Sequence, residues 1–268
     1  LSRLSSEPGV LDSTEAGLLH ESCGLGCLPF LEGQNDVTHS TAVLAVLEHV
    51  RLRAFFEGLF SHDADGVSVT ATTFDYKWLR AVPEGVFTGV HLDRVYMGRG
   101  CEELMTAWIP VGDTPPELGA LAVCEGSHRL PGFARLQATY GTMDVERDGL
   151  DGTGWLTEDP AEVAALGGQW RSAAFAAGDV VVFGMRTLHM STANTVSPPT
   201  VRLSCDVRWQ PSHLPTDARY VGRVDAAERV VSGAAKAALE RAADDDDAAA
   251  AMPKGAKTTI RALRREWG

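Results

Sequence analysis

The sequence predicts a mainly β fold, either a sandwich or a jelly roll, with helices on both flanks. Short β-type runs separated by Gly, Pro and Asp turns fill residues 67–212. A helical pattern precedes these runs, and an Ala- and charge-rich stretch typical of helices follows them. A jelly roll needs about eight strands, and the sequence offers runs in that number.

The composition is that of an ordinary globular protein, with 44% hydrophobic and 22% charged residues among 268. No apolar run approaches the roughly 18 residues that a membrane helix needs, so we expect no membrane partner. The net charge of −12, without a basic stripe, argues against nucleic-acid binding. The five scattered cysteines are typical of reduced thiols, so we expect a cytoplasmic location. A targeting segment upstream of Leu1 is compatible with this sequence.

We expect one domain over residues 1–268, beginning with loops and one helix in residues 1–66. The helix is predicted in DVTHSTAVLAVLEHVRLRAFFEGLF, with Ser40 or Thr41 as its N-cap. The apolar residues at helical spacing are Val43, Val46, Leu47 and Val50.

The strand core is expected over residues 67–212. Within it, residues 133–172 lack strand periodicity, and a stretch that long is more often a lid or a binding loop than filler. Residues 213–268 are typical of C-terminal helices. The expected strands occupy residues 67–74, 76–82, 88–97, 104–111, 119–126, 173–185, 186–194 and 201–210.

Two polar residues interrupt the apolar run TGVHLDRVYMG. Side chains alternate along a strand, so His91 and Asp93 point the same way, either to solvent or into one shared site. His189 follows a buried-type strand and heads another one. Two neutral imidazoles and one carboxylate form the facial triad of non-haem Fe(II) oxygenases, which leaves coordination positions open for a co-substrate and O2.

The strand expected at residues 201–210 has one apolar and one polar face. Val201, Leu203, Cys205, Val207 and Trp209 alternate with Arg202, Ser204, Asp206 and Arg208. Such a strand either lies at the surface with its polar face in water or lines a polar barrel interior. In the second case Arg202 could clamp the distal carboxylate of 2-oxoglutarate, because the guanidinium fork matches a carboxylate.

An ordered set of segments carries a resemblance: KWLRAVPEG, TGVHLDRVYMG, TAWIPVGDTPPELGALAVCEGSH, GDVVVFGMRTLHMSTAN and RLSCDVRWQ. The chain resembles the phytanoyl-CoA dioxygenase family of Fe(II)/2-oxoglutarate-dependent oxygenases. The resemblance implies a double-stranded β-helix, that is, a cupin-like jelly-roll barrel. It also implies Fe(II) as cofactor, with 2-oxoglutarate and O2 as co-substrates. The implied reaction hydroxylates an aliphatic C–H bond of a small organic substrate and releases succinate and CO2.

Residue by residue, the resemblance implies roles for positions of this chain. His91, Asp93 and His189 become iron ligands, and Arg202 becomes the co-substrate clamp, with Arg208 as the fallback because Arg202 lies farther from His189 than is usual. Thr106 and Trp108 would contact the co-substrate, and Trp78 and Arg80 would lie at the substrate pocket. The insert would help to select the substrate. His128, in a Gly-Ser-His turn, is expected to support the site rather than to bind iron.

Two other functions fit the same residues. Zinc accepts the same three ligands, so a zinc hydrolase or isomerase is one alternative. The other is a catalytically silent module that keeps the fold and the ligand-binding site. Arg202 favours the oxygenase, because a zinc hydrolase has no need of a dicarboxylate clamp. Asp93 favours hydroxylation over halogenation, because related halogenases replace the carboxylate by a small residue to make room for halide.

Overall fold

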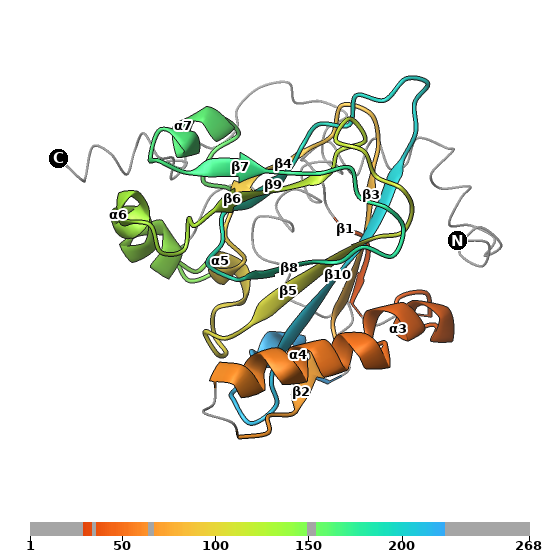
Figure 1. Cartoon of the computed structure of the whole chain (residues 1–268), viewed down its shortest axis with the longest axis vertical. Coiled ribbons are helices and arrows are strands. Elements are labelled where there is room, and N and C mark those ends of the chain that lie inside the picture. The colour runs from red at the N-terminus through yellow and green to blue at the C-terminus, as the bar shows by residue number, and fades with distance from the viewer. Residues whose placement is uncertain (1–28, 34–35, 64–66, 149–153, 223–268) are drawn as a thin grey trace, which may run out of the picture.

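The computed structural model describes residues 29–33, 36–63, 67–148 and 154–222 (Figure 1). The loops expected before residue 29 and the helices expected after residue 222 lie outside these ranges. Within them, the last element is a short 3-10 helix at Ala218–Tyr220. No helix of the described chain is long and apolar enough to span a membrane.

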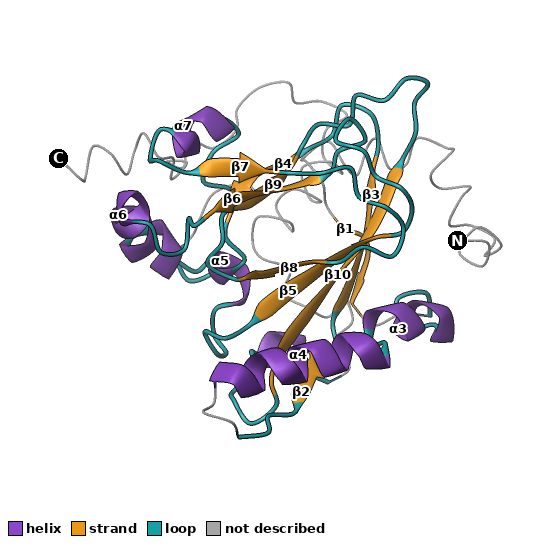
Figure 2. Cartoon of the chain, viewed as in Figure 1, coloured by secondary structure: helices purple, strands orange, loops and turns teal. Residues whose placement is uncertain are grey.

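Two antiparallel sheets lie face to face, with helices around them (Figure 2). The first sheet has the order β1-β3-β10-β5-β8, with β2 paired to β10, and the second has the order β4-β9-β6-β7. The prediction of a mainly β, jelly-roll architecture with flanking helices is therefore confirmed. The strands are β1 Pro29–Gly33, β2 Ala71–Thr73, β3 Lys77–Val82, β4 Thr88–His91, β5 Met105–Pro110, β6 Leu121–Glu125, β7 Gln169–Arg171, β8 Val181–Gly184, β9 His189–Ser191 and β10 Arg202–Pro211.

The N-terminal helix is split into α3, Thr41–Leu47, and α4, Val50–Asp63. Ser40 is the N-cap, and its hydroxyl accepts a hydrogen bond from the backbone N–H of Val43. The split corrects the expectation of one continuous helix. Val46 and Val50 are 50% and 70% exposed, whereas the other two apolar positions are buried.

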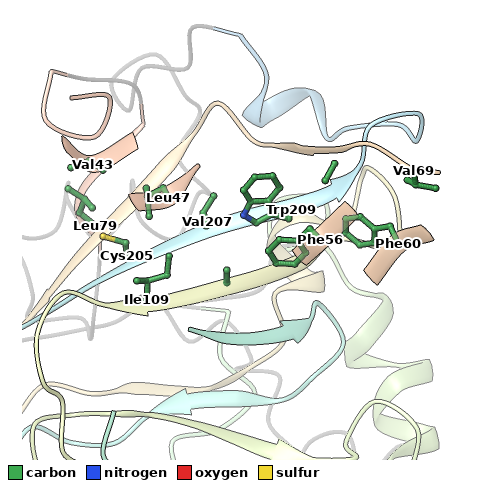
Figure 3. Close-up of a cluster of buried hydrophobic side chains, with 12 residues drawn as sticks. Val43, Leu47, Phe56, Phe60, Val69, Leu79, Ile109, Cys205, Val207 and Trp209 are labelled. Atoms are coloured by element: carbon green, nitrogen blue, oxygen red, sulfur yellow. The ribbon is translucent and has the colours of Figure 1, made fainter. Parts of the chain in front are cut away.

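The apolar face of β10 packs on these two helices (Figure 3). Trp209 stacks on Phe56 of α4 at 5.1 Å between ring centroids. Because helices cover this face, the polar face of the same strand points into the space between the sheets. The two possibilities left open by the sequence are thereby decided: β10 lines a polar interior.

The run at residues 88–97 is a strand only as far as His91. The chain then turns into a one-turn helix, α5, at Arg94–Met97, for which Asp93 is the N-cap. The backbone N–H groups of Tyr96 and Met97 donate to the carbonyl of Asp93 and close this turn. The expectation of one strand through Asp93 is therefore wrong, although both polar side chains still reach the same interior.

The insert at residues 133–172 forms the helices α6, Ala134–Ala138, and α7, Pro160–Ala164, followed by β7. Figure 1 places these elements beside the second sheet. Apolar residues of the insert, among them Leu136, Tyr140 and Leu156, pack with Val90 and Leu92 in one buried cluster. None of the insert's described residues lines the interior cavity. The sequence pattern does not predict β7 or β1.

Candidate active site

Three potential metal ligands meet at one end of the second sheet. His91 ends β4 and His189 begins β9, and the two residues are direct partners in the strand register. Asp93 follows two residues after His91, at the start of α5. One ligand atom from each residue lies within 4.8 Å of the others, and all three side chains are buried. The fold thus brings together the three residues that the sequence singled out.

Both histidines present the same ring nitrogen to the cavity. Nδ1 of His91 lies 2.8 Å from the carbonyl of Gly89, and Nδ1 of His189 lies 2.9 Å from the carbonyl of Thr187. A carbonyl only accepts, so each Nδ1 carries the proton and donates it, which leaves the lone pair of each Nε2 for a metal. Burial lowers the pKa of His91 to about 3 and also lowers the pKa of His189. Both rings are therefore neutral at pH 7, as metal ligation requires.

Asp93 is held as a carboxylate by two neighbours. Thr106 donates its hydroxyl to Oδ2 at 2.5 Å, and Arg208 donates to the same oxygen at 3.1 Å. Burial raises the pKa of Asp93, but the positive charge of Arg208 and the hydrogen bond from Thr106 oppose this effect, and that pKa lies well below its usual range. The guanidinium of Arg208 lies over the ring of Trp78 at 4.7 Å, which orients it.

Arg202 opens β10 and points into the cavity, where it is 2% exposed. It donates to the carbonyl of Gly119, and its guanidinium lies over the ring of Trp108 at 5.7 Å. The long connection before it is anchored by Asn194, whose amide donates to the carbonyls of Val82 and Thr200. This anchor places Arg202 in the cavity despite its greater distance along the chain from the second histidine.

The fallback, Arg208, is already engaged. It forms the ion pair with Asp93 and also lies 3.7 Å from Asp206. Arg202 is therefore better placed than Arg208 to receive a co-substrate carboxylate. Thr106 lines the cavity, but its hydroxyl donates to Asp93.

The two residues on β3 that were expected at the substrate pocket differ in their position relative to the cavity. Arg80 lines the cavity, and its Nε donates to Asp206 at 2.5 Å. Trp78 is not among the described cavity-lining residues, which corrects its expected place. It packs instead against Tyr76 and Tyr220, behind Arg208. Alternation along β3 does point both residues inward, but the guanidinium covers the indole.

The Gly-Ser-His turn supports the site through its serine. His128 is exposed, whereas Ser127 is buried and accepts a hydrogen bond from the backbone N–H of Leu188 at 2.9 Å. Leu188 precedes His189, so this bond fixes the start of β9. A buried hydroxyl beside a tight turn is a weak sequence signal, and only the fold identifies its partner.

The donor set fits Fe(II), since two neutral imidazoles and one carboxylate converge from one side. The same donors would hold zinc. The buried Arg202 on the cavity wall fits the distal carboxylate of 2-oxoglutarate, a group that a zinc hydrolase does not need.

The chain is similar to several known proteins. The sequence profile described as phytanoyl-CoA dioxygenase (PhyH) matches residues 35–198, a range that contains the three potential ligands and ends before Arg202. The 1-deoxypentalenic acid 11-beta-hydroxylase of Streptomyces exfoliatus is 31% identical over 126 residues. That alignment covers 47% of this chain and 41% of the hydroxylase, so the match spans less than half of the relative's length.

Solved structures of low identity also align. The non-heme alpha ketoglutarate dependent epimerase SnoN from nogalamycin biosynthesis is 21% identical, with a TM-score of 0.46 and 76% of each chain covered. The carbocyclase SnoK from the same biosynthesis is 20% identical, with a TM-score of 0.46, and the alignment covers 79% of this chain and 78% of SnoK.

Proposed function

The chain belongs to the phytanoyl-CoA dioxygenase family of Fe(II)- and 2-oxoglutarate-dependent oxygenases, and on that premise we propose that it hydroxylates an aliphatic C–H bond of a small organic substrate. Succinate and CO2 are the other products. The enzyme class and the cofactors expected from the sequence are those of this family. The observation that carries the proposal is the buried cluster of His91, Asp93 and His189, with its ligand atoms within 4.8 Å of one another.

His91 and His189 would hold the iron through Nε2, because their Nδ1 protons are committed to backbone carbonyls. Asp93 would supply the third ligand, and Thr106 and Arg208 fix the orientation of its carboxylate. When bound, Fe(II) and 2-oxoglutarate supply the oxidising chemistry, which converts 2-oxoglutarate to succinate and CO2 and inserts one oxygen atom of O2 into the C–H bond.

Arg202 would bind the distal carboxylate of 2-oxoglutarate. Its burial removes competing water, which strengthens a charged hydrogen bond, and the ring of Trp108 supports the plane of its guanidinium. The guanidinium of Arg202 also donates to the backbone carbonyl of Gly119, which lies just before β6 of the second sheet. Together these contacts pre-form the co-substrate site.

Hydroxylation is the outcome that Asp93 favours. Its carboxylate would occupy the coordination position that a halide needs, and its ionised form is held in place by an ion pair. The Streptomyces exfoliatus relative, by its name a hydroxylase, supports the same outcome.

Turnover with different metals tests the proposal. We expect the protein to form succinate from 2-oxoglutarate with Fe(II) and O2, but not with Zn(II), and a substrate to gain one oxygen atom by mass spectrometry. Asp93→Ala should lower succinate formation at least about 100-fold, because even the loss of a residue that hydrogen-bonds to a metal ligand lowers metal affinity or activity by about 10–100-fold. The matched control, Glu125→Ala, alters an exposed carboxylate on β6. No succinate formation by iron-loaded protein would favour the zinc enzyme or the silent module.

A further inference from the structure

The described residues that line the cavity carry unequal charge. They include three guanidinium groups, on Arg80, Arg202 and Arg208, and two carboxylates, on Asp93 and Asp206. The two histidines add no charge as metal ligands, because each Nδ1 donates its proton to a backbone carbonyl and each Nε2 keeps its lone pair for the metal. The described part of the lining therefore has one positive charge in excess.

Filling the site with its cofactor and co-substrate leaves this excess in place. Fe(II) brings two positive charges and 2-oxoglutarate brings two negative charges, so their sum is zero. An unbalanced charge in a cavity shielded from water is unfavourable, because the medium screens it poorly. A substrate with one negative charge would balance the filled site.

The position of Arg80 indicates where that negative charge would bind. Its side chain is 19% exposed, whereas the side chain of Asp206, its partner, is 6% exposed. The side chains of Arg208 and Asp93 are 3% and 4% exposed. Of the charged side chains on the described cavity wall, Arg80 thus lies nearest to solvent, where a substrate would enter.

The two carboxylates are poorly placed to receive a cationic substrate. Asp206 lies between Arg80, at 2.5 Å, and Arg208, at 3.7 Å. Asp93 is bound by Thr106 and Arg208. A substrate ammonium would therefore meet a guanidinium beside either carboxylate, and like charges repel at such distances.

The remaining wall is apolar where Leu121, Phe183 and Met190 line the cavity. We propose, on the basis of the proposed function, that the substrate is an amphipathic carboxylic acid whose carboxylate binds to Arg80 and whose apolar body lies against this wall. A guanidinium has five N–H donors in a planar fork, so an arginine can hold a substrate carboxylate in addition to other partners.

Binding of matched probes to the loaded protein tests the proposal. Octanoate, octanol and octylamine share one apolar chain and differ in charge. Each is titrated calorimetrically into anaerobic protein with Fe(II) and saturating 2-oxoglutarate. The weak visible charge-transfer band of the chelate between Fe(II) and 2-oxoglutarate, recorded on the same sample, shows that the site is filled. We expect saturable octanoate binding, and binding of the other two that is at least about tenfold weaker.

Arg80→Gln should weaken octanoate binding by about tenfold to a hundredfold, the range of a charged hydrogen bond. The double variant Arg80→Gln/Asp206→Asn removes both partners of the ion pair, so it leaves no unpaired Asp206 behind. Weaker octanoate binding in this variant as well would show that Arg80 itself recognises the carboxylate. Arg171→Gln, which alters an exposed arginine on β7, should bind octanoate as the wild type does.

Three results would overturn the proposal: octanol or octylamine binding as tightly as octanoate, unchanged octanoate affinity in both Arg80 variants, or no saturable octanoate binding to protein that shows the band. Absence of the band in iron-loaded protein would instead contradict the proposed function, and the inference would fall with it.

Discussion

Among single residues, Arg208 has a central place in the candidate iron site. It links Asp93 to Asp206 in a buried chain of alternating charge that continues to Arg80. Breaking a buried ion pair leaves a charge without its partner, which costs about 3–5 kcal/mol. In the metal-free protein, Arg208 is thus expected to stabilise the fold as well as to orient the carboxylate.

Arg208→Met keeps much of the side-chain volume and removes the charge. We expect Fe(II) affinity to fall by about 10–100-fold, because residues that orient metal ligands contribute that much. We also expect the metal-free variant to unfold at lower denaturant concentration. Metal titration and chemical unfolding measure the two effects, with the exposed Arg171→Met as control. Unchanged metal affinity in a folded Arg208→Met would contradict this role.

The buried histidines make the metal-free protein sensitive to acid. His91 has its pKa lowered by burial to about 3, against 6.5 in the unfolded chain. Below pH 6.5 the unfolded chain therefore binds a proton that the folded protein does not, and stability falls as the pH drops from 6.5 towards about 3. The slope approaches about 1.4 kcal/mol per pH unit for one such histidine. His189, whose pKa is also lowered by burial, acts in the same direction.

Chemical unfolding of EDTA-treated protein between about pH 7 and about pH 5 measures this loss. His91→Asn should show a shallower dependence, because it removes one of the two groups. The matched control is His128→Asn, which alters an exposed histidine. A wild-type stability that does not change over this interval would show that the imidazoles are not buried neutral groups.

At the scale of elements, the connection between β9 and β10 sets the place of Arg202. Asn194 is fully buried and holds this connection to Val82 and Thr200 by two amide hydrogen bonds of 2.8 and 2.7 Å. Its loss would free the start of β10 without touching the three potential ligands. We therefore expect the connection to affect 2-oxoglutarate binding rather than iron binding.

Asn194→Ala should raise the KM for 2-oxoglutarate by about tenfold, the effect of losing one to two hydrogen bonds. Fe(II) affinity should stay near the wild-type value. Steady-state kinetics and metal titration separate the two, with Thr195→Ala at the exposed neighbouring position as control. An equal loss of iron affinity would indicate general disruption of the site.

At the scale of the whole molecule, the sequence predicted the architecture because strand alternation is a local signal. It also predicted that His91, Asp93 and His189 meet, even though Asp93 lies in a helical turn after the strand. The side chains of His91 and Asp93 still point inward, because the helical turn follows β4 directly.

The sequence could not assign long-range partners. Arg208 and Asp206 stand out as polar residues on β10, but only the packed sheets show that they join Asp93 to Arg80. The insert at residues 133–172 lacks a clear period, because its helices are single short turns joined by loops. Its described part packs behind the second sheet, so its role as a lid stays a prediction.

The visible absorption of the anaerobic protein with Fe(II) and 2-oxoglutarate tests the assignment of both the iron site and the Arg202 clamp. The wild type should show the weak charge-transfer band of the iron chelate. Arg202→Ala should need about tenfold to a hundredfold more 2-oxoglutarate to develop that band, because it loses a charged hydrogen-bond partner, and Arg171→Ala should match the wild type. No band in iron-loaded wild type would contradict the assignment of the site, and an unchanged 2-oxoglutarate requirement in Arg202→Ala would contradict the clamp.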